Sequence, residues 1–132
     1  MTVLGTRAAD RESLDAALSR PDQRLVICLC AAWCDTCEEF KVTFAHLARS
    51  DPDASYIWID IEDDSELVGD IDIENFPTIA VYRAGVPVFF GVTLPQESVV
   101  ARTLAALASR TAPVEVHAVI AGLPEALRAR SR

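Results

Sequence analysis

A buried strand that runs directly into an amphipathic helix, with two cysteines at the junction, constrains this chain more than any other feature. The apolar run Leu25 to Ala32 leads into Trp33-Cys34-Asp35-Thr36-Cys37, and apolar residues at helical spacing then continue to about Arg49. The run does not alternate in polarity, which is typical of a central strand covered on both faces. The sequence therefore predicts a strand over 25–31 and a helix over 37–49, joined at a dithiol.

The position of the two cysteines at this junction has a chemical consequence. A cysteine at a helix N-terminus faces unpaired backbone N–H groups and the positive end of the helix dipole, which stabilise a thiolate relative to a thiol. Cys34 is therefore the candidate nucleophile. Cys37 lies three residues on, on the same face of the first turn, within reach of a mixed disulfide formed on Cys34. We interpret the pair as a two-electron redox switch.

Patterns along the rest of the chain predict further helices and strands. Ala84-Gly85 leaves too few residues between two strands for a crossover, so these strands are expected to form a hairpin. The order predicts an α/β fold: a mixed central sheet made of a parallel crossover unit and an antiparallel hairpin, with helices on both faces. The expected elements are a helix over 8–19, a strand over 55–61, a short helix over 65–68, strands over 79–83 and 86–90, and a helix over 98–109.

The segment from Thr111 to Arg132 lies beyond this unit. It carries Pro113, Gly122 and Pro124, and its helical pattern is weak before Pro124. The chain is expected to form one domain over 1–110, followed by a C-terminal extension over 111–132. The arginines of the extension suggest two roles: folding back onto an acidic surface, or self-association.

Composition and charge limit the classes of partner. The 132 residues include 20 acidic and 12 basic side chains, and this net charge of −8 argues against binding to nucleic acid or to an anionic membrane surface. No apolar stretch approaches the roughly 18 residues that a membrane span needs. Residues 60–74 hold eight acids and no base. They form either a solvated face or a border of the substrate groove that favours basic clients.

The distribution of cysteines indicates a cytoplasmic protein. All four cysteines lie within ten positions, at 28, 30, 34 and 37, whereas a secreted disulfide scaffold would spread them. The first ten residues show no secretory signal. Cys28 and Cys30 share one face of the strand and are predicted to be small buried hydrophobic side chains. The alternatives are a second disulfide with the active pair, or a zinc or iron–sulfur site, which the fixed geometry of a strand disfavours; no metal is expected.

Several motifs in register resemble the thioredoxin family. Trp-Cys-x-x-Cys after a buried strand is typical of that family, and Phe76-Pro77-Thr78 stands before the hairpin, where thioredoxin-like proteins place a cis-proline. The resemblance covers roughly residues 2–109. It implies a thioredoxin-like fold in which Cys34 attacks a disulfide, Cys37 resolves it, and the backbone beside Pro77 pairs with an extended substrate segment. The substrate-binding residues that it implies are Trp33, Phe76, Pro77 and Thr78.

One departure from the family pattern concerns proton transfer. The family's buried acid lies six residues before the attacking cysteine, and Cys28 holds that position here. Tyr56 stands where the family has the companion lysine. A neutral thiol is a poor proton acceptor near pH 7, so resolution by Cys37 is expected to be slower or to use water.

Two further departures lie close to the nucleophile. Asp35-Thr36 replaces Gly-Pro between the cysteines, and a carboxylate beside Cys34 opposes the thiolate that the helix N-terminus favours. The pair is therefore expected to be a weak oxidant. Cys30 stands where thioredoxins commonly have an aromatic residue.

The favoured function is that of a thiol–disulfide oxidoreductase that reduces or exchanges protein disulfides and needs no cofactor. Its expected partners are protein disulfide substrates and an upstream thiol reductant, and the oligomeric state is left open. The alternative is a thioredoxin-like binding or assembly module that binds an extended peptide beside Pro77 and whose dithiol is vestigial or redox-sensing. The missing buried acid and the extension favour this alternative a little.

Overall fold

Helices and strands alternate through most of the chain. The computed structural model describes residues 3–20, 22–69, 71, 73 and 75–131. The elements in chain order are a 3-10 turn Ala8–Asp10, α1 Arg11–Leu18, β1 Arg24–Cys30, α2 Asp35–Ser50, β2 Ala54–Asp60, α3 Ser65–Val68, β3 Thr78–Arg83, β4 Val86–Val92, α4 Glu97–Leu107, α5 Ala118–Ala121 and α6 Leu123–Ser131. The predicted order of elements over residues 8–109 is confirmed, with boundaries that shift by one or two residues.

Four strands form one mixed sheet in the order β2-β1-β3-β4. β1 runs parallel to β2 and antiparallel to β3, and β3 pairs with β4 in the expected hairpin. Leu4 adds a short parallel bridge to Ile57 on the outer side of β2. The central position of β1 explains its unbroken apolar run, because both of its faces and both of its edges are covered.

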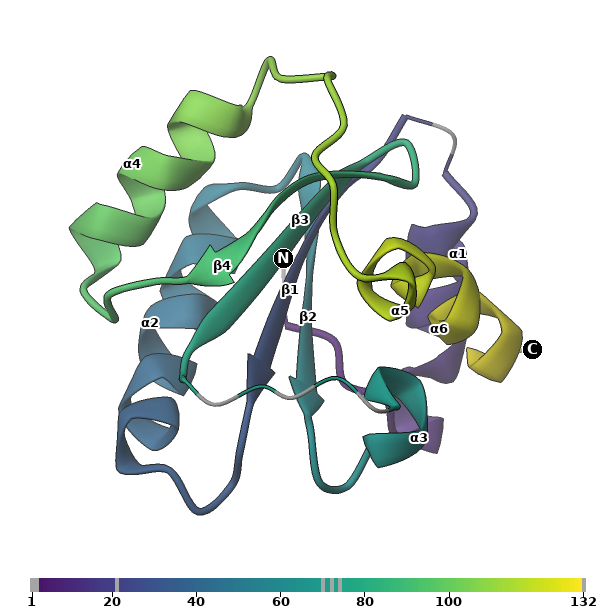
Figure 1. The fold of residues 1–132 in the computed structure, drawn as a ribbon, viewed down its shortest axis with the longest axis horizontal. Coiled ribbons are helices and arrows are strands. Elements are labelled where there is room, and N and C mark those ends of the chain that lie inside the picture. Colours follow the sequence, from purple (N-terminus) through teal and green to yellow (C-terminus); the bar gives the residue numbers. More distant parts are fainter. Residues whose placement is uncertain (1–2, 21, 70, 72, 74, 132) are drawn as a thin grey trace.

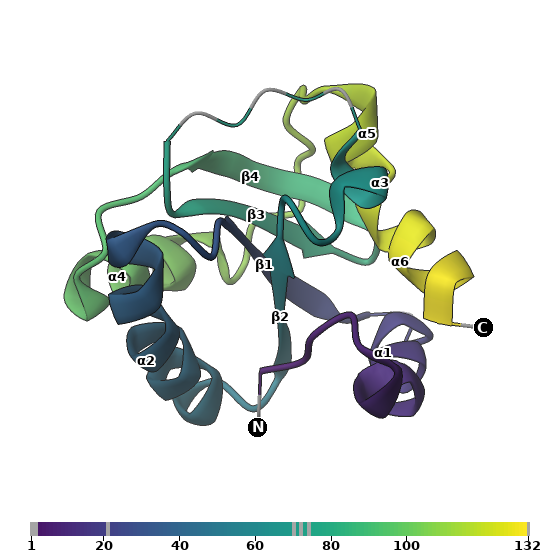
Figure 2. The ribbon, with the colours of Figure 1, turned by 90° about the horizontal axis from the view of Figure 1, so that it is seen from below.

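Helices cover both faces of this sheet, as predicted. On one face, α2 and α4 pack over a cluster that includes Phe40, Phe44, Tyr56 and Val81. On the other face, α1 and α6 lie side by side, with α3 and α5 beside them (Figures 1 and 2). The two apolar layers meet at the sheet, which makes the α/β arrangement a consequence of burying both faces of β1.

The turn between β3 and β4 requires positive φ angles at two successive residues. Ala84 has φ 51° and Gly85 has φ 81°, which suits a two-residue turn that matches the twist of the strands. The backbone N–H of Ala84 donates to the carbonyl of Gln23, 2.9 Å away. This bond ties the hairpin to the residue that precedes β1.

The C-terminal segment packs onto the sheet. Ile120, Leu123 and Leu127 are each fully buried, in the same cluster as residues of α1 and β1. The Tyr82 hydroxyl donates to the Ile120 carbonyl, 2.5 Å away, and the Val114 N–H donates to the Pro87 carbonyl, 3.0 Å away. The described part of the extension thus completes the apolar layer that α1 begins. Within the described residues, no helix is both long enough and apolar enough to cross a membrane.

Candidate functional site

Cys34 occupies the N-cap position of α2. Its N–H donates to the Ala31 carbonyl, 3.1 Å away, which closes the turn after β1, and its carbonyl accepts the N–H of Glu38 at 3.2 Å. The helix therefore begins at Asp35, two residues earlier than predicted. Cys34 is a free cysteine and is half-buried. The structure thus places a partly accessible thiol at the positive end of a 16-residue helix, the location that favours negative charge.

Cys37 forms a disulfide with Cys30, and their Cα atoms are 5.8 Å apart. Cys30 is the last residue of β1 and Cys37 lies in the first turn of α2, so both side chains enter the apolar layer between the sheet and α2. They are 0% and 1% exposed, respectively. The predicted burial of Cys30 is confirmed. Its bond to Cys37 differs from the favoured interpretation of Cys30 as a packing residue and matches the alternative of a further disulfide with the active pair.

Cys28 lies beneath this disulfide and is a free, fully buried thiol. Its sulfur is 3.8 Å from that of Cys30. Burial raises the pKa of the Cys28 thiol well above its ordinary value, so it remains protonated near neutral pH and is a poor base. Tyr56 does not supply the missing charge, because its hydroxyl donates to Asp51, 2.9 Å away, near the start of β2.

The raised pKa of Cys28 predicts a loss of stability in alkaline solution. Below about pH 8.5 both folded and unfolded states hold this proton; above it only the unfolded state releases it, so the free energy of unfolding falls. By pH 10 the loss is expected to reach about 2 kcal/mol. Urea denaturation of wild-type protein and a Cys28→Val variant at pH 8 and pH 10, in the same redox state, measures it. Between pH 8 and pH 10 the free energy of unfolding of the variant should fall by about 2 kcal/mol less than that of wild type. Equal falls would show that Cys28 ionises as readily in the folded as in the unfolded protein.

The neighbouring cysteines do not form a metal centre in this structure. Among the described residues, no group of three or more His, Cys, Asp and Glu side chains is arranged to hold an ion. Two of the four sulfurs are bonded to each other. In this structure the four cysteines are present as one disulfide and two free thiols.

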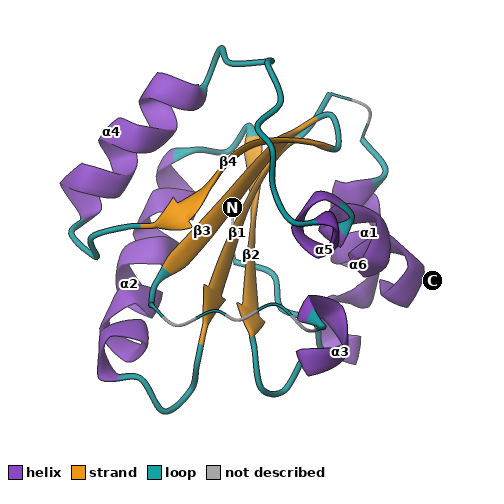
Figure 3. Ribbon diagram, in the orientation of Figure 1, coloured by secondary structure: helices purple, strands orange, loops and turns teal. Residues whose placement is uncertain are grey.

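An exposed apolar surface adjoins Cys34. Trp33 is 67% exposed and meets the ring of Phe76 edge to face, with 5.6 Å between ring centroids. Phe76 precedes Pro77, and the peptide bond between them is cis. The end of β1 and the start of β3 lie at the same end of the sheet, because the two strands are antiparallel (Figure 3). The sequence-predicted residues Trp33, Phe76 and Pro77 are thus brought together close to Cys34.

Two further exposed apolar residues lie near Pro77 in the backbone pairing and were not singled out from the sequence. Val92 and Leu94 are 55% and 63% exposed. Val92 pairs with Thr78, and the N–H of the intervening Thr93 donates to the Pro77 carbonyl, 3.0 Å away. Exposed apolar residues at a strand end are common and do not by themselves indicate a site. We refer to Trp33 and Phe76 as the apolar rim.

The remaining predicted residues take different positions. Thr78 is 2% exposed and its hydroxyl donates to the Asn75 carbonyl, 2.7 Å away, so this side chain fixes the loop and does not face a substrate. Asp35 is exposed in the first turn of α2, and Thr36 is half-buried beside it. Asp35 therefore stands next to Cys34 with its carboxylate in solvent, where its effect on the thiol is screened.

Two carboxylates of the acidic segment accept hydrogen bonds in the structure. The Asp60 carboxylate accepts the N–H groups of Glu62 and Asp63. Asp64 is 5% exposed and accepts the hydroxyl of Thr6, 2.9 Å away. Asp70, Asp72 and Glu74 lie outside the described residues.

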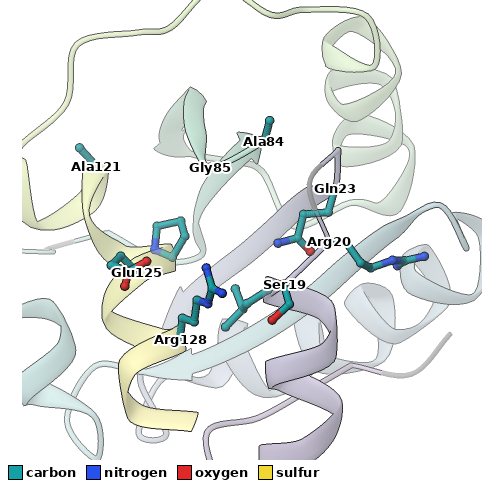
Figure 4. Close-up of a pocket in the computed structure, with 10 residues that line it drawn as sticks. Ser19, Arg20, Gln23, Ala84, Gly85, Ala121, Glu125 and Arg128 are labelled. Atoms are coloured by element: carbon teal, nitrogen blue, oxygen red, sulfur yellow. The ribbon is translucent and has the colours of Figure 1, made fainter. Parts of the chain in front are cut away.

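A separate cavity of about 280 Å³ lies at the other end of the sheet. It is bounded by the end of α1, the β3–β4 turn and α6 (Figure 4). Gln23 lines it and immediately precedes β1, whereas Cys30 ends that strand, so the cavity is about 20 Å from the cysteines. It takes no part in the site described above.

Comparison with known sequences gives one family across most of the chain. Residues 5–109 match the family model described as Thioredoxin. A 75-residue stretch is 32% identical to Thioredoxin domain-containing protein 2 of Mus musculus, and it covers 56% of this chain but only 15% of that protein. Thioredoxin-2 of Saccharomyces cerevisiae is 24% identical over 80 residues, covering 61% of this chain and 77% of its own length.

Solved structures give the same fold. A poplar thioredoxin h mutant superposes with a TM-score of 0.68 and 18% identity, covering 85% of this chain and 87% of the poplar chain. A mutant thioredoxin from Halobacterium salinarum gives a TM-score of 0.65 and 20% identity, with 84% and 95% covered. At these identities the match concerns the fold alone.

Proposed function

Because this chain belongs to the thioredoxin family, we propose that it reduces protein disulfides through Cys34 and Cys37. Proteins of the family act on protein disulfides, and the disulfide between Cys30 and Cys37 supports thiol–disulfide oxidoreductase chemistry in general. The observation that carries the proposal is the free Cys34 thiol at the N-terminus of α2, beside an exposed apolar rim. It combines a reactive sulfur with a surface for a client.

The first step of the proposed reaction takes place at Cys34. Its thiolate attacks one sulfur of the client disulfide, a mixed disulfide forms, and the other client sulfur leaves as a thiolate. The helix N-terminus stabilises the attacking anion, and partial exposure lets the client reach it.

The second step releases the client. In the reduced protein, the Cys37 thiolate attacks the Cys34 sulfur of the mixed disulfide, and the second client sulfur leaves. The N–H of Ala31 is 3.4 Å from the Cys37 sulfur and can donate to it, which favours negative charge there. No carboxylate takes the place of the family's buried acid at position 28, so water is the proposed proton acceptor.

The apolar rim is the proposed client-binding surface. Replacing Trp33 by alanine removes its most exposed aromatic anchor and is expected to lower kcat/KM for a protein disulfide by about ten-fold. The rate of reduction of a small disulfide should be unchanged, because such a molecule is too small to pack against the rim while it reacts at Cys34. Val42→Ala is the matched control, because Val42 is 61% exposed on α2 and lies two turns from Cys34. An equal loss with both substrates would assign Trp33 to the chemistry.

Reduction is the proposed direction, and the cytoplasm is the proposed compartment. Clustered cysteines suit a reducing compartment, where an upstream thiol reductant would regenerate the dithiol.

A binding or assembly module is the second candidate, and one observation favours it. With Cys37 bonded to Cys30, Cys34 has no free Cys37 thiol to resolve a mixed disulfide. A protein held in that state would bind an extended client through the rim and would not turn over.

A single-turnover experiment separates the two candidates. Fully reduced protein is mixed with a disulfide-containing client in the absence of other reductants, and client thiols are counted. The proposal predicts two client thiols for each enzyme molecule oxidised, and a Cys37→Ser variant that accumulates a mixed disulfide at Cys34. If the client binds but no client thiols appear, and if Cys37→Ser forms no mixed disulfide, the reductase proposal is wrong and the binding module is the better account.

A further inference from the structure

Cys37 has two candidate disulfide partners in this fold, Cys30 and Cys34. We propose that Cys30 is a third redox-active cysteine, which takes over the disulfide from the Cys34–Cys37 pair by intramolecular exchange at the Cys37 sulfur. The inference rests on the proposed function, since it starts from the Cys34–Cys37 disulfide that client reduction leaves. Its product is the arrangement in the structure, with Cys30 bonded to Cys37 and Cys34 free.

The fold holds Cys37 between these two partners. Cys30 faces it from the end of β1, and their Cα separation of 5.8 Å lies within the ordinary range for a disulfide, about 4.4–6.8 Å. Cys34 is the N-cap residue of α2 and Cys37 is the third residue of the helix, two positions whose groups lie close together at a helix start. Exchange between the two bonds therefore needs side-chain movement at Cys37 and leaves the strand and helix in place.

The exchange balances within the chain. The Cys30 sulfur attacks the Cys37 sulfur, the Cys34–Cys37 bond breaks, and the electron pair of that bond leaves on Cys34. The proton released by Cys30 is matched by the proton that Cys34 takes up. One disulfide replaces another, so the step needs neither an oxidant nor a reductant.

Differences in environment favour the Cys30–Cys37 product. Cys34 leaves as a half-exposed thiolate at the helix N-terminus, which makes it a good leaving group. Cys30 is 0% exposed, and a thiolate there would be desolvated, whereas a disulfide sulfur carries no charge.

The exchange would give the oxidised protein two properties. Its disulfide is buried, since Cys30 and Cys37 are 0% and 1% exposed, and an external thiol cannot reach either sulfur. Its Cys34 is free to react again. Reduction of the protein would then have to begin with attack by Cys34 on Cys37, which returns the disulfide to the surface.

Peptide mapping tests this directly, because cleavage after Trp33 separates Cys30 from Cys34 and Cys37. The protein is equilibrated with oxidised dithiothreitol, quenched in acid, alkylated and cleaved by trypsin and chymotrypsin. A Cys30–Cys37 bond leaves the pieces on either side of Trp33 linked, with Cys34 alkylated. A Cys34–Cys37 bond leaves them unlinked, with Cys34 protected.

The wild-type protein is expected to give linked pieces. In Cys30→Ser the link should disappear, and alkylation of Cys34 should fall by about ten-fold or more as Cys34 pairs with Cys37. Cys30→Ala gives the same readout if the serine variant does not fold. Cys28→Ser is the matched control, because this residue is equally buried on the same strand face, and it should behave as wild type.

Unlinked pieces with protected Cys34 in the wild type would overturn the inference, as would loss of the link in Cys28→Ser. The small oxidant makes the mapping independent of any client. A protein that shows the Cys30–Cys37 link but reduces no client disulfide would contradict the proposed function and leave the cysteine assignment standing.

Discussion

Replacing Cys34 by serine is expected to lower the rate of protein disulfide reduction by at least about a thousand-fold. A serine hydroxyl at the N-cap of α2 does not ionise near neutral pH, and neither Cys30 nor Cys37 is exposed enough to attack a client in its place. The measurement is the initial rate of client thiol release by pre-reduced enzyme. Circular dichroism shows whether the variant keeps the wild-type fold, as expected for a serine, which is a favoured N-cap residue.

The matched control for this variant is Cys28→Ser. Cys28 is a free cysteine like Cys34 but is fully buried, so its replacement removes a thiol without touching the nucleophile. It is expected to retain reductase activity within about ten-fold of wild type. Activity that survives Cys34→Ser, or that falls equally in both variants, would remove Cys34 from the role of nucleophile.

A chain that stops at Arg110 is expected not to reach the native fold. The deletion removes Ile120, Leu123 and Leu127, three fully buried side chains that cover the sheet beside α1. Each is comparable with a large-to-small core substitution that costs about 2–5 kcal/mol, and their sum approaches the whole stability of a domain. The measurement is chemical denaturation of the truncated and complete chains, followed by near-ultraviolet circular dichroism.

A single substitution provides a graded version of this test. Leu127→Ala is expected to lower the free energy of unfolding by about 2–5 kcal/mol, whereas Glu125→Ala, at an exposed position of the same helix, should change it by less than about 0.5 kcal/mol. A truncated chain as stable as the complete one would mean that residues 1–110 form the domain and that the remainder is an accessory extension.

The extension shows where local patterns were insufficient. The apolar residues at 120, 123 and 127 have helical spacing, but Pro124 interrupts this periodicity in the sequence. In the structure Pro124 is the second residue of α6, where its missing N–H costs nothing. The short helix over 65–68 was predicted correctly, and in the structure Gly69, with positive φ, follows its last residue.

The candidate site was predictable in part for similar reasons. Trp33, Cys34 and Cys37 lie at the junction between a strand and a helix, and the apolar periodicity of the sequence is enough to predict that junction. The bond between Cys30 and Cys37 depends on how the end of β1 faces α2 across a turn, and no local pattern records that distance. The edge-to-face contact of Trp33 with Phe76 likewise joins segments that are distant in the sequence.

The central claim, a reversible dithiol that works as a reductant, is tested most directly by an equilibrium redox titration of the purified protein. Thiol–disulfide buffers set the potential, and alkylated cysteines are counted by intact mass. The account predicts one two-electron transition in which two thiols disappear together, near the thioredoxin value of about −270 mV. A transition near about −180 mV or higher would contradict the reducing role, and the absence of any reversible two-thiol transition would contradict the oxidoreductase itself.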